Sequence, residues 1–432
     1  MTARNSAVPT SRIGAARFPT TGAQAGLWFA AQRLGDTSAY HVVIAFTIEG
    51  DVDGTRLADA WRGLVERTAI LGLRTALDDD GQVVQWFAGA PDTVSWFASP
   101  VSPPDGLDVD PAFLPYVLAP FDLDGGELCR IVAAPTADGR TVAVLVLHHL
   151  LVDGTSQPVI AERFARCLLG EPVEPAGPER YLELVELVRL AEVACLARDR
   201  ERWISRTVDR LGAGWCWPPT VPGIAGHLRH RLDRTGVDRL RSVAERAGGS
   251  LFLGLVGAVH RSLSALGWDR TVVSVAASAR PRGGGHDRVV GAFVNQVPLV
   301  AVHRPHDSLA DLLAREVPGW RTDLAARALP QAGVADDARL ARVGPNLNRV
   351  IVSERRSAGP TAYRWTGSGA VRSVSAELFV RGYEPKADIG VRFVRHSGHV
   401  AYDVEWSARL PPELAERLPT VLAAALAGGD DR

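Results

Sequence analysis

The sequence is poor in cysteine and has no long hydrophobic segment. Its four cysteines are scattered, with no C-x-x-C spacing. Isolated cysteines are typical of reduced thiols in a cytoplasmic protein, so we predict neither a disulfide framework nor a metal site. No apolar run approaches the roughly 20 residues that span a bilayer, and the N-terminus lacks the apolar core of a secretion signal. We therefore expect a cytoplasmic protein without a membrane partner.

Net charge is also close to zero. The chain has 48 lysine and arginine residues against 49 aspartate and glutamate residues, which gives a formal charge of -1 at pH 7. A chain without a net field has no general attraction for nucleic acid, and we predict no nucleic-acid partner. Hydrophobic residues at 46% and a length of 432 residues indicate a globular protein with a large core and two domains or lobes.

The most informative stretch runs from Val142 to Ser156, with the sequence VAVLVLHHLLVDGTS. Its apolar residues 142–147 predict a buried strand, which ends on His148 and His149. Successive side chains of a strand point to opposite faces, so the two imidazoles must differ in role. One should face the interior, and the other should emerge where the strand stops and exchange a proton near neutral pH.

Asp153 and Gly154 follow the two histidines and predict a tight turn, because glycine tolerates a positive φ. Ser156 and Pro158 then begin a predicted helix that runs to about Leu169. A histidine followed by an aspartate at a strand end is more often structural than catalytic. Here a strand, a histidine pair, a glycine turn and a helix N-terminus converge, which favours a functional site.

The heptad HHLLVDG (148–154) resembles the H-H-x-x-x-D-G signature of the condensation domains of nonribosomal peptide synthetases, a family within the superfamily of chloramphenicol acetyltransferase. Residues 120–130 resemble the segment that precedes this signature, and residues 21–32 resemble the first core motif of the family. Residues 290–299 resemble its G-x-F-V-N-T motif, with Gln296 in place of threonine. The later H-Q-D-x-P-F-E motif is absent. The resemblance covers residues 20–425.

The resemblance implies an α/β (α+β) fold of two chloramphenicol-acetyltransferase-like lobes, arranged as a V-shaped pseudo-dimer with a central tunnel. The glycine- and proline-rich stretch before residue 227 is the best boundary in the chain. Farther on, Asp388–Arg395 and His399–Trp406 predict a hairpin. The expected organisation is a disordered lead-in (1–16), an N-terminal lobe with the signature (17–211), a linker (212–226) and a C-terminal lobe (227–432).

The resemblance also implies roles for the signature residues. His149 is the expected catalytic residue, which accepts a proton from the acceptor or holds it in line. The N–H of Gly154 is expected to polarise a thioester carbonyl beside the helix N-terminus. His148 is expected to point back into the lobe and order the turn.

Other residues are expected to support the site. In the family an arginine pairs with the signature aspartate, here Asp153. Arg67 is the predicted partner, with Arg74 as the alternative, although residues 67–75 lack the histidine and glutamate that the family has in this region. Asn295 and Ser156 are predicted to line the substrate tunnel.

The implied reaction is the attack of a small-molecule amine or alcohol on an acyl or aminoacyl thioester, as in natural-product biosynthesis. The chain is expected to bind no cofactor itself, because the phosphopantetheine thioester arrives on a peptidyl or acyl carrier protein. We expect a monomer. The sequence leaves open whether the product is an amide or an ester, and whether the acceptor is free or carrier-bound. One alternative is an acyltransferase of the same superfamily that uses acyl-CoA, and another is a non-catalytic docking protein, which the intact signature disfavours.

Overall fold

The computed structural model describes residues 16–34, 38–89, 94–104, 108–212, 215–217, 221–343, 347–356, 362–380 and 385–428. The predicted disordered lead-in lies outside these residues except for its last residue, and so does part of the predicted linker. Within the described part, no helix is both long and apolar enough to cross a membrane.

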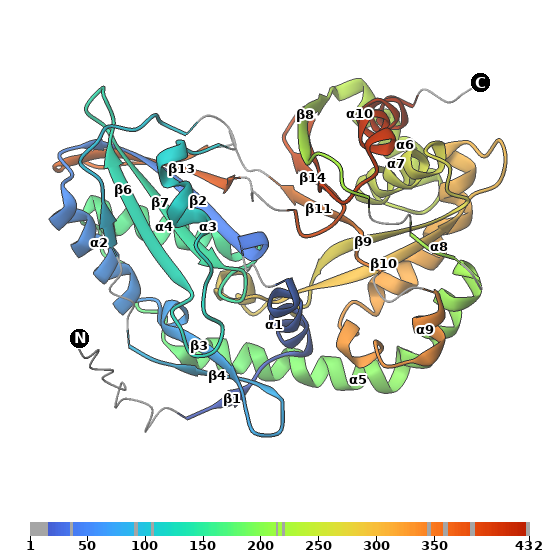
Figure 1. Cartoon of the computed structure of the whole chain (residues 1–432), viewed down its shortest axis with the longest axis horizontal. Coiled ribbons are helices and arrows are strands. Elements are labelled where there is room, and N and C mark those ends of the chain that lie inside the picture. Colours follow the sequence, from blue (N-terminus) through green and yellow to red (C-terminus); the bar gives the residue numbers. More distant parts are fainter. Residues whose placement is uncertain are drawn as a thin grey trace, which may run out of the picture.

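Two open six-stranded sheets form the centres of two lobes (Figure 1). The N-terminal sheet has the order β12-β13-β2-β7-β6-β5, and the C-terminal sheet has the order β10-β9-β11-β14-β15-β8. A small third sheet has the order β1-β4-β3. This mixed α/β architecture confirms the predicted fold class; the V shape and the tunnel stay predictions. The strands are β1 (Phe18–Pro19), β2 (His41–Gly50), β3 (Leu73–Leu77), β4 (Val83–Phe87), β5 (Val94–Trp96), β6 (Cys129–Pro135), β7 (Thr141–His148), β8 (Gly226–Leu232), β9 (Arg270–Ser278), β10 (Val294–Val302), β11 (Val350–Arg356), β12 (Ala362–Thr366), β13 (Val371–Val380), β14 (Ile389–Arg395) and β15 (Val400–Trp406).

Strand β7 lies inside the N-terminal sheet, between β2 and β6, and is antiparallel to both. All its residues are buried, which explains its continuous apolar sequence. Helix α4 packs on this sheet, where Phe164 meets Phe46 edge to face with ring centroids 4.9 Å apart. The pairing of β7 with its neighbours fixes the point at which His148 and His149 leave the sheet. The helices are α1 (Gly22–Leu34), α2 (Gly54–Glu66), α3 (Leu114–Leu118), α4 (Ser156–Leu169), α5 (Pro178–Leu211), α6 (Arg234–Arg246), α7 (Leu251–Ala265), α8 (Leu309–Ala325), α9 (Ala338–Val343) and α10 (Pro412–Ala427).

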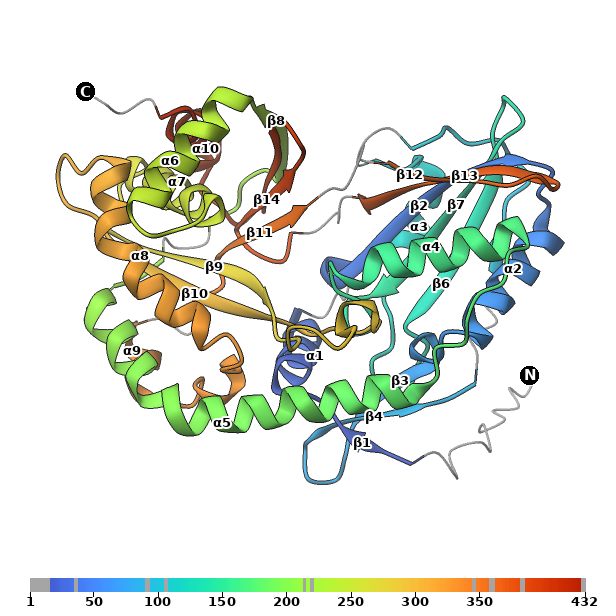
Figure 2. The same ribbon diagram turned by 180° about the vertical axis from the view of Figure 1, so that it is seen from behind.

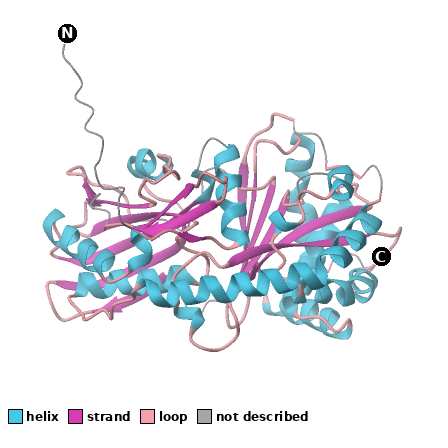
Figure 3. Ribbon diagram, turned by 90° about the horizontal axis from the view of Figure 1, so that it is seen from below, coloured by secondary structure: helices cyan, strands magenta, loops and turns pink. Residues whose placement is uncertain are grey.

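The long helix α5 belongs to both lobes (Figure 3). Its 34 residues extend over about 50 Å. Tyr181 and Leu184 near its start join the core of the N-terminal lobe. Trp203 and Ile204 near its end pack in a separate cluster with Val272 and other residues of the C-terminal sheet. The predicted N-terminal lobe, which ended at residue 211, therefore needs correction, because the second half of α5 packs on the other lobe.

The C-terminal lobe is not one continuous segment either. Strands β12 and β13 leave it and join the N-terminal sheet, where β13 pairs with β2 (Figure 2). This pairing covers an edge of β2 that would otherwise expose unpaired backbone groups. The predicted lobe boundary (227–432) is thus wrong for residues 362–380, since the N-terminal sheet is completed by a late excursion of the chain.

Candidate active site

His148 lies in the interior at the end of β7. Its side chain is fully buried, and Nδ1 accepts a hydrogen bond of 3.2 Å from the backbone N–H of Leu150. The ring lies among Tyr40, His41 and Phe121. Burial, with smaller contributions from His41, His149 and Lys386, holds its pKa well below the ordinary value. His148 is therefore a neutral side chain that shapes the turn after the strand.

The side chain of His149, unlike that of His148, reaches the surface. Its backbone N–H donates to the carbonyl oxygen of Tyr40 at 2.8 Å, and its side chain is partly exposed. The imidazole is thus not sealed in packing, although Nδ1 is buried and has no hydrogen-bond partner among the described residues. Burial and then the charge of Lys386 lower the pKa of His149 to about 3, while the charge of Asp153 acts in the other direction. At neutral pH the imidazole is uncharged and can accept a hydrogen bond.

Asp153 is held by Arg280, and the prediction of Arg67 as its partner is wrong. The guanidinium of Arg280 forms a buried ion pair with Oδ2 of Asp153, and the backbone N–H of Phe293 donates to the same oxygen at 3.0 Å. Oδ1 accepts from the backbone N–H groups of Thr155 and Ser156 at 3.1 and 3.0 Å. The carboxylate thereby joins the start of α4 to the segment between β9 and β10.

Arg280 also donates hydrogen bonds to several other groups beside Asp153. Nη2 donates to the hydroxyl of Ser156 at 3.0 Å and to the carbonyl oxygens of Val289 and Gly291, each at 3.1 Å. Nε donates to the carbonyl oxygen of His286 at 3.1 Å. We call Asp153, Ser156 and Arg280 the interlobe clamp, because Arg280 follows strand β9 of the C-terminal sheet and the other two belong to the N-terminal lobe.

Ser156 and Asn295 are both buried and hydrogen-bonded within the protein, which gives no support to their predicted place in a substrate tunnel. Ser156 is fully buried, and its hydroxyl donates to the carbonyl oxygen of Gly291 and accepts from the backbone N–H of Gly291. The side-chain amide of Asn295 donates to the carbonyl oxygens of Arg327 and Leu329 at 3.0 and 2.7 Å. The polar groups of both side chains are therefore engaged in hydrogen bonds within the protein.

Gly154 is exposed, directly after the clamped aspartate. Its φ angle is not positive, so the reason given for a glycine turn is wrong. A Cβ atom placed on Gly154 would meet no atom of the described residues within 4 Å. The backbone therefore does not require glycine here, and the space next to it is open.

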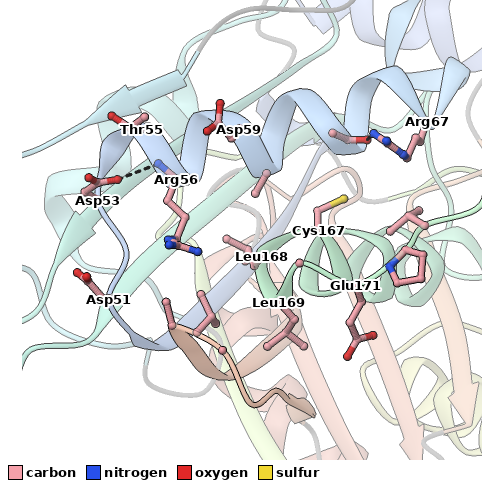
Figure 4. Close-up of a pocket in the computed structure, with 18 residues that line it drawn as sticks. Asp51, Asp53, Thr55, Arg56, Asp59, Arg67, Cys167, Leu168, Leu169 and Glu171 are labelled. Atoms are coloured by element: carbon pink, nitrogen blue, oxygen red, sulfur yellow. Dashed lines mark hydrogen bonds between the residues drawn. The ribbon is translucent and has the colours of Figure 1, made fainter.

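Arg67 lies elsewhere, at the C-terminal end of α2 (Figure 4). Its guanidinium donates to the carbonyl oxygen of Gly63 at 3.3 Å and lies 3.9 Å from the carboxylate of Glu66. It borders an open pocket of about 870 Å³ that α2, the end of α4 and the turn before β13 line, and His149 is not among the lining residues. Arg74, the alternative partner, instead faces Glu127 at 3.6 Å.

Two residues of the site were missed from the sequence. Arg280 begins the run Arg280-Pro281-Arg282-Gly283-Gly284-Gly285, and no local pattern shows that this arginine crosses to another lobe. Lys386 acts electrostatically on both histidines of the signature. Its only sequence signal is that it is a lysine in a chain whose other basic residues are arginines. Across the described ranges, no cluster of histidine, cysteine, aspartate and glutamate is arranged to hold a metal ion.

Comparison with known proteins places this chain in a family. A model of the condensation domain matches residues 15–317. The chain belongs to the condensation domain family, which is found in nonribosomal peptide synthetases. It is 31% identical over 306 residues to the AMB antimetabolite synthetase AmbE of Pseudomonas aeruginosa, which covers 65% of this chain and 14% of that protein. The chain spans only 4–14% of the length of the first curated relatives that it matches.

Solved structures show the same fold. The X-domain from teicoplanin biosynthesis aligns with a TM-score of 0.72 at 19% identity and covers 99% of this chain and 97% of that one. The first condensation domain of the calcium-dependent antibiotic synthetase, solved with a substrate analogue, aligns with a TM-score of 0.68 at 21% identity. That alignment covers 95% of this chain and 96% of the other.

Proposed function

We propose that this protein is a condensation enzyme that joins a carrier-bound acyl or aminoacyl thioester to an amine or hydroxyl acceptor. The observation that carries the proposal is the neutral, partly exposed His149, which emerges from β7 beside an immobilised Asp153. The donor is expected to arrive on the phosphopantetheine arm of a carrier protein, and the chain itself contributes no cofactor. We place the reaction in the cytoplasm and expect a monomer with a passage between the lobes.

The reaction needs alignment more than a strong base. The lone pair of the acceptor nitrogen attacks the thioester carbon, a C–N bond forms and the C=O electrons move to oxygen. When the carbonyl re-forms, the C–S bond breaks and the sulfur takes up the proton that nitrogen loses. Because burial and the charge of Lys386 lower the pKa of His149, we assign it mainly to accepting a hydrogen bond and holding the nucleophile in line. Positioning of two bound reactants can supply roughly 7–11 kcal/mol.

Gly154 fits a second part of this mechanism. Its backbone N–H lies in the turn that leads into α4, and no side chain fills the adjacent space. A donor at a helix N-terminus stabilises the negative charge that develops on a thioester oxygen. We therefore assign Gly154 to the carbonyl of the donor and His149 to the acceptor.

The test replaces His149 by alanine and measures product formation from a carrier-bound acyl thioester. We expect kcat/KM to fall about 10²-fold, as for a reactant that is no longer held in line, with unchanged circular dichroism. His306→Asn, a change at an exposed histidine with φ of 64°, is the matched control and should retain full activity. Full activity of a folded His149→Ala protein would remove this histidine from the mechanism. The same assay with acyl-CoA as donor decides between carrier-dependent and CoA-dependent transfer.

A further inference from the structure

Lys386 is the only lysine among the 48 lysine and arginine residues of the chain. It lies just before β14, in the segment that returns from the N-terminal sheet to the C-terminal sheet. Nearby, Asp388 is tied to Arg349 at 2.5 Å and to Arg409 at 3.3 Å. The backbone that carries Lys386 is therefore fixed to the C-terminal lobe.

The side chain of Lys386 reaches the other lobe. Its ammonium nitrogen lies 5.6 Å from the centre of the Tyr40 ring. Tyr40 is the residue whose carbonyl oxygen accepts the backbone N–H of His149, and its ring lies 6.3 Å from that of His148. The positive charge of Lys386 contributes to the lowered pKa of both histidines. The lysine is thus part of the same site, although it comes from a distant part of the sequence.

Within the described residues Lys386 has no ion-pair partner, although the charge of Glu405 acts on it. Among the residues that the structure describes, no hydrogen bond or ion pair to the ammonium group of Lys386 is present. The side chain keeps some exposed surface. Burial lowers its pKa to about 8, and Arg392 adds to this effect, while Glu405 opposes it. A desolvated ammonium without a counter-ion is costly, so a ligand that supplied negative charge would be bound favourably.

The other charged groups around Lys386 do not provide an ion-pair partner either. Asp153 is paired with Arg280. The charges of Arg33 and Arg409 add positive potential at Tyr40. Nε2 of His148 and Nδ1 of His149 are buried and unpartnered within the described ranges. Asp153 and Asp388 are thus already paired with arginines, and Glu405 is the acidic residue that acts on Lys386 from a distance.

We propose that Lys386 forms an anion subsite beside His149, which a negatively charged oxygen of a reactant occupies. The inference rests on the proposed function. The oxygen has two possible sources: a carboxylate carried by the acceptor, or the oxyanion that forms on the thioester carbonyl during attack. A compact ammonium suits a single oxygen atom better than a planar, forked guanidinium does, which accounts for a lysine at this position in a chain otherwise rich in arginine.

The first experiment needs no turnover. Labelling with lysine that carries ¹³C only at Cε gives one side-chain signal, because the chain has one lysine. A carboxylate at the subsite should raise the pKa of Lys386, since the negative charge favours the ammonium form. We expect acetate to shift this signal and its titration midpoint upward in a saturable manner, and neutral acetamide of the same shape to leave both unchanged.

The second experiment separates the two sources by kinetics. Lys386→Met removes the charge, Lys386→Arg keeps it, and Arg342→Met, at an exposed arginine of α9, is the matched control. With a carboxylate occupant, Lys386→Met should raise KM about 10–100-fold for an amino-acid acceptor but not for its amide. With an oxyanion occupant, kcat should fall about 10–100-fold for both acceptors. Lys386→Arg should retain more activity than Lys386→Met in either case.

The proposal is overturned if acetate has no effect on the lysine signal and Lys386→Met keeps the kcat and KM of the unmodified protein for both acceptors. That result would leave the proposed function standing, provided that His149→Ala is inactive. Conversely, an active His149→Ala protein would refute the role of His149, while the lysine signal would still report on the anion subsite.

Discussion

Two neighbouring regions of this protein differ in whether their polar groups have hydrogen-bond partners. In the interlobe clamp, Asp153, Ser156 and Arg280 are buried and hydrogen-bonded to each other and to backbone groups. His149, after β7, and Lys386, before β14, keep exposed surface. Among the described residues Nδ1 of His149 has no hydrogen-bond partner, and the ammonium group of Lys386 has no hydrogen bond or ion pair. Saturated buried polar groups fix a structure, and unsatisfied ones are kept for a ligand or a reaction. The clamp therefore connects the lobes, and His149 and Lys386 are the groups that we propose to contact the reactants.

The largest expected effect comes from breaking the clamp. Arg280→Met leaves the carboxylate of Asp153 buried without its cation, and removal of one partner of a buried pair costs about 3–5 kcal/mol. We expect the free energy of unfolding to fall by that amount in urea titrations. The double variant Asp153→Asn/Arg280→Met removes both charges and should lose less stability than the sum of the single changes. Simple additivity would show that the pair is not coupled.

A smaller effect is expected at Gly154, and it should appear in activity rather than stability. Because its φ angle is not positive and the space around a Cβ atom is open, Gly154→Ala should change the free energy of unfolding by no more than about 0.5 kcal/mol. The added methyl group would stand where we place the donor carbonyl, so kcat/KM should fall at least about tenfold, as expected for a misplaced reactant.

Gly139→Ala is the matched control for this substitution. Gly139 also has open space around a Cβ atom, but its φ is 81°, so alanine should cost about 1–2 kcal/mol of stability without loss of activity. The opposite result, with Gly154→Ala fully active and Gly139→Ala inactive, would contradict our placement of the donor.

The two regions also differ in how far the sequence predicts them. The strand before His148, the start of α4 and the hairpin of β14 and β15 follow from local patterns of apolar residues, turns and helix starts. The partners of Asp153 do not, because Arg280 and Phe293 are distant in sequence and reach it through packing between lobes. Lys386 could not be predicted for the same reason, since it reaches the site from a distant part of the sequence. The pairing of β13 with β2 is also a contact between distant segments, so β13 could not be assigned to the N-terminal sheet from its sequence.

The smallest effect is expected at Arg67, where the sequence predicted a member of the site and the structure shows a surface residue. The hydrogen bond of its guanidinium to Gly63 and its contact with Glu66 at 3.9 Å both lie at the end of its own helix, and exposed ion pairs contribute about 0–1 kcal/mol. Arg67→Met should therefore leave kcat/KM unchanged and lower the free energy of unfolding by less than about 0.5 kcal/mol. A large loss of activity with normal stability would require that the pocket beside α2, which Arg67 borders, takes part in binding the carrier protein or a reactant. Arg280→Met removes the same charge from a buried position. The free energies of unfolding of Arg67→Met and Arg280→Met therefore compare a cation outside the interlobe clamp with one inside it.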